Sequence, residues 1–197
     1  AALMDLEISP LAPENFPKMP EVAGVRMATA ETGEKYKGRP DLLLIELKQD
    51  TTVAGALTKS TAPGHPVSWC KNNLKLGKAR GLIVNAGNAN VFTGKQGLRV
   101  VEETAKSVSE IFCCRDDEIF VASTGVIGEK LDHKKITQQI PKLSCEFQTN
   151  KWKQAAIAIT TTDTFPKGAF RSVKIGTTSI NVVGIAKGSG MIAPDMA

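Results

Sequence analysis

The sequence contains few of the residues that nucleic-acid-binding proteins and histidine-dependent hydrolases rely on. Aromatic residues make up only 5% of the 197 positions, so surfaces on which bases could stack are few. Only two histidines occur, His65 and His133, and neither has an evident serine or cysteine partner. A Ser–His–Asp site within this chain is therefore not expected.

Long apolar runs and paired metal-binding cysteines are missing as well. No stretch approaches the roughly 20 apolar residues that cross a bilayer, and the first residues lack the features of a signal peptide. None of Cys70, Cys113, Cys114 and Cys145 stands in a C-x-x-C pair with a matching histidine, which argues against structural zinc. We therefore expect a cytoplasmic protein with reduced thiols, no membrane segment and no metal.

The formal net charge of +5 comes from basic residues that are scattered and interleaved with acidic ones, as in residues 130–135. Basic residues that bind nucleic acid are instead clustered on one face. We interpret the charge as solvated surface and expect no nucleic-acid partner. The hydrophobic fraction of 42% is sufficient for a globular core.

The apolar pattern predicts an α/β protein that follows a short N-terminal arm. Residues 1–20 carry four prolines, so an extended arm is expected, and residues 21–197 are expected to form a single α/β domain. The predicted strands are 22–28, 41–47, 52–57, 81–84, 119–122, 172–176 and 180–185. The predicted helices are 66–75, 97–112, 132–140 and 150–159.

Four finer expectations accompany these elements. The run 41–47 is apolar throughout, which predicts a strand that is buried on both faces. Pro141 is expected to end the third helix, and Asn150 to cap the start of the fourth. The last two strands are expected to form a hairpin around Thr177–Thr178.

Small polar residues follow two of the predicted strands. Ser123-Thr124-Gly125 comes after 119–122, where backbone N–H groups commonly meet a ligand, although a plain turn would use the same residues. The three asparagines of Asn85–Asn90 follow the strand 81–84. We assign them the structural role of holding an irregular backbone, rather than a binding role.

Two further features could contact a substrate. Thr161-Thr162-Asp163-Thr164 ends a predicted helix in polar residues, which either bond local carbonyls or contact a substrate. Lys187 leaves a predicted strand between Ile185 and glycines, so a position in a cleft is plausible for its ammonium group. The chain then ends on residues 193–197, which are expected to be a free end made by cutting a longer chain.

Four segments together carry a resemblance to a known family. The chain resembles the alpha chain of ornithine acetyltransferase, also called bifunctional glutamate N-acetyltransferase, of arginine biosynthesis. The segments are Gly184–Ala197, Asn85–Gly94, Ala122–Gly128 and Thr161–Thr164 with Pro166-Lys167. The resemblance implies a four-layer sandwich of two β-sheets flanked by helices, in a self-cleaving acyltransferase of the N-terminal-nucleophile type.

The resemblance also implies the roles of individual residues. Thr124 and Gly125 would form the oxyanion hole, and Thr161 and Lys187 would contact the substrate. The precursor would cut itself after Ala197, and the threonine that begins the beta chain would be the nucleophile. Its own α-amine would serve as the base, which suits a chain without a catalytic histidine.

The function implied is transfer of the acetyl group of N-acetylornithine to glutamate through an acetyl-enzyme, without cofactor or metal. Some members of the family also accept acetyl-CoA, and α/β pairs associate into a heterotetramer. Two alternatives remain open from the residues: an aminopeptidase with the same self-cleaving fold, and a non-catalytic binding domain. Arg26–Ala30 and Trp69-Cys70 fit the family pattern only loosely, and about the first 20 residues vary in such proteins, as termini commonly do.

Overall fold

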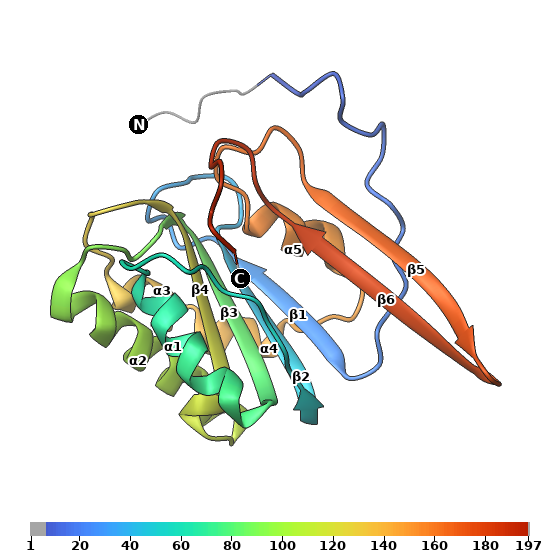
Figure 1. Cartoon of the computed structure of the whole chain (residues 1–197), viewed down its shortest axis with the longest axis horizontal. Coiled ribbons are helices and arrows are strands. Elements are labelled where there is room, and N and C mark those ends of the chain that lie inside the picture. Colours follow the sequence, from blue (N-terminus) through green and yellow to red (C-terminus); the bar gives the residue numbers. More distant parts are fainter. Residues whose placement is uncertain (1–6, 197) are drawn as a thin grey trace.

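Two β-sheets and their helices form the protein, whose computed structural model describes residues 7–196 (Figure 1). The larger sheet has the order β1-β2-β3-β4, and the smaller is the hairpin β5–β6. The strands are β1 (Val25–Ala30), β2 (Leu42–Thr52), β3 (Lys78–Asn88), β4 (Ile119–Val126), β5 (Lys167–Ile175) and β6 (Thr178–Ala186). The expected α/β sandwich with two sheets and flanking helices is confirmed.

The helices are α1 (His65–Asn73), α2 (Gly94–Phe112), α3 (His133–Thr137), α4 (Ile140–Cys145) and α5 (Trp152–Ala158). Two short 3-10 helices, Leu74–Leu76 and Asp116–Glu118, precede β3 and β4. Figure 1 shows α1 and α2 on one side of the larger sheet and α5 between that sheet and the hairpin. No helix between residues 7 and 196 is long and apolar enough to cross a bilayer.

The strand pairing places the ends of β3 and β4 together. β1, β2 and β3 pair antiparallel, whereas β3 and β4 pair parallel across the connection that contains α2. Because the carboxyl ends of parallel strands meet at the same edge of a sheet, the residues that end β3 and β4 are neighbours.

The larger sheet is buried on both faces, as the apolar run in 41–47 predicted. On one face, Leu42 and Leu44 of β2 belong to a core cluster that also contains residues of α2, such as Val101 and Val108. On the other face, Leu43 belongs to a second cluster with α5 and the hairpin. Successive side chains of a strand point to opposite faces, so this single strand contributes to both clusters.

Four details of the predicted elements were wrong. Residues 53–57 form no strand, since β2 itself continues to Thr52 through an irregular pairing after Glu46. The helix expected over 132–140 is two helices, and Pro141 lies in the first turn of α4, where its missing N–H costs nothing. The N-cap of α5 is Lys151 rather than Asn150. The expected hairpin of the last two strands is confirmed, with its turn at Gly176–Thr177.

Residues 7–20, the described part of the expected arm, form no helix or strand. The segment nevertheless packs on the body: Met19 is buried, and Trp152 Nε1 of α5 donates a hydrogen bond to the Pro20 carbonyl at 3.0 Å. The division into an arm and one domain over 21–197 stays a prediction.

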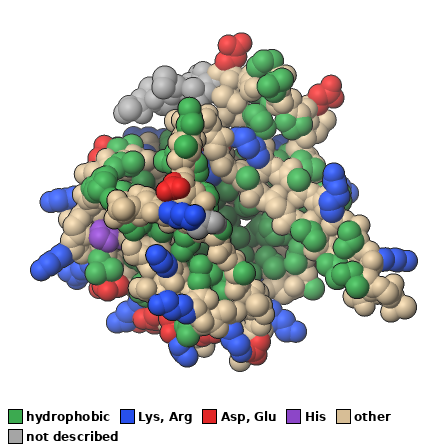
Figure 2. Space-filling model, viewed as in Figure 1, with side chains coloured by type: hydrophobic (Ala, Val, Ile, Leu, Met, Phe, Trp, Pro, Cys, Tyr) green, Lys and Arg blue, Asp and Glu red, His purple; other side chains and the backbone are tan. Residues whose placement is uncertain are grey.

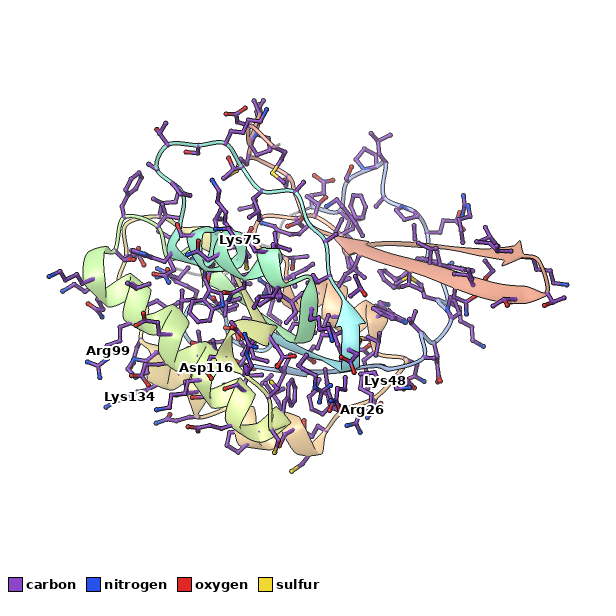
Figure 3. All side chains as sticks on the ribbon, turned by 60° about the horizontal axis from the view of Figure 1, so that its bottom comes forward. Arg26, Lys48, Lys75, Arg99, Asp116 and Lys134 are labelled. Atoms are coloured by element: carbon purple, nitrogen blue, oxygen red, sulfur yellow. The ribbon has the colours of Figure 1, made fainter. Side chains whose placement is uncertain are left out.

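Charged side chains lie around the outside of this core. Figure 3 shows Arg99 of α2 and Lys134 of α3 on the outer side of the helical layer. Ion pairs hold others in place, such as Lys35 with Glu129 across two loops. Because these pairs are exposed, each contributes at most about 1 kcal/mol to folding, so the two apolar clusters carry most of the stability.

The core makes a direct prediction about stability. Replacing the fully buried Leu44 by alanine should lower the free energy of unfolding by about 2–5 kcal/mol, because it removes apolar contacts and leaves a cavity. The control is Leu98→Ala on α2, where the side chain is 44% exposed and a change within roughly 0.5 kcal/mol is expected. Urea denaturation of the whole protein measures both; equal effects would contradict the assigned core.

Candidate active site

The residues that end β3 and β4 pair side by side at one edge of the larger sheet. Asn85 pairs with Ser123, Ala86 with Thr124 and Gly87 with Gly125. Ser123, Thr124 and Gly125 therefore belong to the strand, which continues to Val126, rather than to a turn after it. The parallel pairing fixes the position of the Thr124 backbone relative to β3.

Gly125 lies at a close approach of two backbones. Its φ is +133°, a conformation that residues with a Cβ rarely adopt. A Cβ at this position would lie 2.6 Å from the backbone nitrogen of Asn88 and closer still to the carbonyl carbon of Gly87. Only glycine fits here without moving β3, which explains the residue type independently of any catalytic role.

Lys187 joins Thr124 to Thr161. Its Nζ donates a hydrogen bond to Thr124 Oγ1 at 2.9 Å and to Thr161 Oγ1 at 2.7 Å. These residues come from the end of β4, the segment after α5 and the residue after β6. The structure thus brings together three of the side chains that the sequence singled out.

Asp163 fixes the backbone on both sides of this contact. Its carboxylate accepts hydrogen bonds from the backbone N–H groups of Gly188, at 2.6 Å, and Thr161, at 3.2 Å. It also pairs with the ammonium group of Lys167 at 2.7 Å, and its own side chain has no exposed area. The carboxylate therefore orients the residues next to Lys187 and Thr161.

Burial and neighbouring charges set the protonation of these groups. Burial lowers the pKa of Lys187, and the nearby Lys167 lowers it further, whereas Asp163 partly opposes the shift. Burial by itself would raise the pKa of Asp163, but the hydrogen bonds from Lys167, Gly188 and Thr161 outweigh it, so the pKa is lowered. Asp163 thus remains a carboxylate, and its negative charge partly offsets the cost of burying the Lys187 ammonium.

The arrangement presents two hydroxyls and one ammonium at the same place. The Lys187 ammonium has three N–H donors, two of which are taken by the threonine hydroxyls. Hydroxyl and ammonium donors are suited to a carboxylate or to the negative oxygen that develops in acyl transfer.

The asparagines of Asn85–Asn90 hold the backbone in shape, as the sequence analysis assigned. The Asn88 amide donates to the Glu129 carbonyl at 3.0 Å, and the Asn90 amide donates to the Gly97 carbonyl at 2.9 Å. The Ser123 hydroxyl donates to the Asn85 side-chain oxygen at 2.5 Å. These amides tie the end of β3 to α2 and β4.

The last described residues run beside residues 58 and 59. The Thr58 hydroxyl donates to the Pro194 carbonyl at 2.7 Å, and the Lys59 N–H donates to the Asp195 carbonyl at 2.7 Å. Ala197, the predicted cleavage position, lies outside the described residues.

Neither a metal site nor the cavity beside β1 belongs to this cluster in the described part of the chain. Between residues 7 and 196, no cluster of three or more His, Cys, Asp or Glu side chains could hold a metal ion. A cavity of about 490 Å³ lies beside the edge strand β1, between Thr29, Phe147 and Lys151. It shares no residue with the cluster around Lys187, so it does not enlarge that site.

Lys167 is a residue of this site whose role the sequence pattern did not reveal. It was quoted with its neighbour Pro166 as part of the resemblance, but no role was given to its side chain. The signal that could have found it is its spacing: Asp163 and Lys167 are four residues apart, and the structure joins them as an ion pair.

Comparison with known proteins identifies related sequences. The ArgJ family profile matches residues 26–197. The chain is 51% identical to the arginine biosynthesis bifunctional protein ArgJ of Mesorhizobium japonicum and 52% identical to that of Bradyrhizobium diazoefficiens. Each match covers 98% of this chain but 47% of the relative, so the chain spans about half the length of the curated relatives it matches.

Two solved structures share the fold. One is the arginine biosynthesis bifunctional protein ArgJ of Bacillus halodurans, with a TM-score of 0.82 and 32% identity over 89% of this chain and 92% of that chain. The other is ornithine acetyltransferase from Mycobacterium tuberculosis complexed with ornithine, with a TM-score of 0.80 and 32% identity over 89% of this chain and 93% of that chain.

The contacts of Asp163 predict how stability depends on pH. Its pKa is lower in the folded protein, so its stabilising contribution is present above the unfolded value of about 3.9 and is lost as the pH falls through the folded value. Asp163→Asn should therefore lower stability at neutral pH, and the difference from the unmodified protein should shrink below about pH 4. Thermal unfolding from pH 3 to 7 measures this; a difference that is independent of pH would contradict it.

Proposed function

Since its residues 26–197 match the family profile, the chain belongs to the ArgJ family, and on this premise we propose that it is one part of an acetyltransferase. The enzyme moves the acetyl group of N-acetylornithine to glutamate in arginine biosynthesis. The observation that carries the proposal is the contact of Lys187 with Thr124 and Thr161 at the edge of the larger sheet. Relatives of similar sequence are named for arginine biosynthesis.

The proposed reaction has two halves and uses a threonine that begins a second chain. In the first half, the threonine hydroxyl oxygen bonds to the acetyl carbon of N-acetylornithine, and the bond from that carbon to the ornithine nitrogen breaks. The threonine proton passes through its own α-amine to the departing ornithine amine. In the second half, the amine of glutamate attacks the acetyl ester, which restores the threonine hydroxyl.

In this proposal, Thr124 and Gly125 form the oxyanion hole. The Thr124 hydroxyl and the Gly125 backbone N–H would donate hydrogen bonds to the negative oxygen of the tetrahedral intermediate. The pairing of β4 with β3 supports this oxyanion role. It fixes the backbone around Gly125, so the donors do not have to reorganise during the reaction. Lys187 adds positive charge next to Thr124, which favours the same oxygen.

The same proposal gives Thr161 and Lys187 contacts with the amino-acid substrate. The Lys187 ammonium can pair with a substrate carboxylate, and the Thr161 hydroxyl can hydrogen bond to a polar group next to it. The related enzyme from Mycobacterium tuberculosis was solved with ornithine, a ligand that carries such a carboxylate. The reaction needs no metal or cofactor.

We propose that the precursor is cut after Ala197 and that the nucleophile begins the beta chain. The length comparison supports a divided protein. The curated relatives are about twice as long as this chain, whereas the matched chains of the two solved structures are 92% and 93% covered by it. A chain of about this length therefore recurs in related proteins. Two such α/β pairs would associate in the cytoplasm as a heterotetramer.

The outer face of the hairpin supports a second chain. Cross-strand partners point to the same face, so Phe170 and Val183 pack into the core, while Val173 and Ile180 point outward. The outward residues are 46% and 37% exposed, and Val182 on the same face is 58% exposed. Figure 2 shows hydrophobic side chains on the surface over this hairpin. A two-stranded hairpin with an uncovered apolar face is marginally stable, which favours a partner that covers it.

Two alternatives differ from the acetyltransferase in what happens to the acyl group. An aminopeptidase of the same self-cleaving fold would pass the acyl group to water or to another amine, and a non-catalytic binding domain would transfer none. The polar cluster around Lys187 favours the acetyltransferase over a binding domain, because an ammonium group beside the Thr124 hydroxyl suits the negative oxygen that develops in acyl transfer. Use of acetyl-CoA as a second donor also belongs to the proposal.

The first test is the composition of the whole protein. Expressed at the full length of its relatives, it should yield two polypeptides by intact mass and denaturing gel, one ending at Ala197 and one beginning with threonine. Incubated with N-acetylornithine and glutamate, it should form ornithine and N-acetylglutamate. An uncut, inactive and well-folded protein would overturn the proposal, and release of free acetate alone would favour the hydrolytic alternative.

The oxyanion role predicts a specific loss. Thr124→Ala should lower kcat of acetyl transfer by about 10²–10³-fold, because one donor to the negative oxygen is removed. Thr162→Ala is the control, since Thr162 is exposed in the same region. Steady-state kinetics of both variants, after mass spectrometry has verified complete cutting, measures the difference. Equal rates for both variants would assign Thr124 a structural role.

A further inference from the structure

The loop between β1 and β2, residues 31–41, touches both halves of the site. One half is the paired end of β3 and β4 at Gly87 and Gly125, and the other is the segment after α5 that carries Thr161. In Figure 1 this loop lies at the same end of the molecule as the segment that follows β6. The two halves come from different elements, and this loop contacts both of them in addition to Lys187, which joins Thr124 to Thr161.

Arg39 of this loop holds the end of α5. Its Nη2 donates to the Thr160 carbonyl at 2.7 Å, and its Nη1 donates to Thr160 Oγ1 at 2.5 Å and to the Ile157 carbonyl at 3.4 Å. The last carbonyls of a helix lack partners within the helix and carry partial negative charge, so a guanidinium there is favourable. The residue immediately after Thr160 is Thr161, whose position therefore depends on Arg39.

Tyr36 connects the same guanidinium to the strand ends. The Arg39 guanidinium lies over the Tyr36 ring, with its central carbon 3.8 Å from the ring centre. On the other side, a Cβ at Gly87 would lie 3.4 Å from Tyr36 Cε2 and 2.8 Å from the Cβ of Lys35. A Cβ at Gly87 would therefore clash with Lys35, whereas Tyr36 lies at ordinary contact distance from this position, whose backbone pairs with Gly125.

The loop itself is closed by internal contacts. The fully buried Asp41 accepts hydrogen bonds from the Thr32 N–H at 2.7 Å and from the Thr32 hydroxyl at 2.8 Å. Near the tip, the Gly38 N–H donates to the Glu31 carboxylate at 2.8 Å. These bonds tie the two ends of the loop together, so Tyr36 and Arg39 are held against the body rather than free to move.

We propose that Arg39, stacked on Tyr36, is a positioning residue that sets where Thr161 lies relative to the oxyanion residues at the end of β4. The proposal rests on the proposed acetyltransferase function. Arg39 does not touch the substrate; it acts through Thr160 and the backbone of α5. Loss of Arg39 should therefore impair substrate binding at Thr161 more than it impairs stabilisation of the oxyanion at Thr124.

The kinetic test uses the complete, cut enzyme. Arg39→Gln should raise KM for N-acetylornithine by about tenfold or more while kcat stays within about threefold, because ground-state contacts at Thr161 are misplaced. Arg39→Lys should give a smaller rise in KM, since an ammonium group cannot both bond Thr160 through two nitrogens and stack flat on the Tyr36 ring. Tyr36→Phe, which keeps the ring, should retain the KM that Tyr36→Ala loses. Lys37→Gln is the control for loss of one positive charge in the same loop, where the side chain is exposed.

A second readout does not depend on activity. Hydrogen–deuterium exchange of the segment 158–163 should be faster in Arg39→Gln than in Lys37→Gln, while the strands of the larger sheet remain equally protected. An unmodified enzyme that transfers acetyl groups, with KM and exchange unchanged in Arg39→Gln, would overturn the positioning role and leave the proposed function intact. An unmodified protein without acetyl transfer would overturn the proposed function, and the exchange result would then decide whether Arg39 orders this segment.

Discussion

The ammonium group of Lys187 is the contact through which two separately built parts of the molecule meet. Thr124 belongs to the larger sheet, and Thr161 belongs to the segment between α5 and the hairpin; one amine reaches both hydroxyls. The amine is partly buried, which lowers its pKa, and the nearby Asp163 carboxylate partly opposes this shift. The geometry of the candidate site depends on this contact, because it joins a strand of the larger sheet to the segment after α5.

The larger sheet and the segment after α5 hold the residues that Lys187 contacts in different ways. The parallel pairing of β3 and β4 fixes the end of one strand against the other, and the close approach at Gly87 and Gly125 excludes side chains there. In the segment after α5, the Asp163 carboxylate accepts hydrogen bonds from the backbone N–H groups of Thr161 and Gly188. The backbone is thus held on both sides of Lys187, which is the condition for donors that need no rearrangement.

The hairpin has a different character from the sheet beside it. Its inner face continues the second core cluster through Phe170, Val183 and Ile185, while its outer face presents β-branched residues to solvent. Successive side chains of a strand point to opposite faces, so the residues between those that pack into the core must point outward. The proposal of a second chain rests in part on this uncovered apolar face.

The elements with strong periodicity and the residue types at the candidate site could be predicted from the amino-acid sequence alone. The apolar run 41–47 indicated a strand buried on both faces, and the spacing in 97–112 indicated a helix; motifs singled out Thr124, Gly125, Thr161 and Lys187. Weak local signals failed, as at residues 53–57 and Pro141, because sheet register and tertiary packing override propensity there. Two contacts of the site could be found only in the tertiary structure. Lys187 reaches Thr124, 63 residues away, and Arg39 reaches Thr160, 121 residues away. Such hydrogen bonds leave no periodic pattern in the sequence.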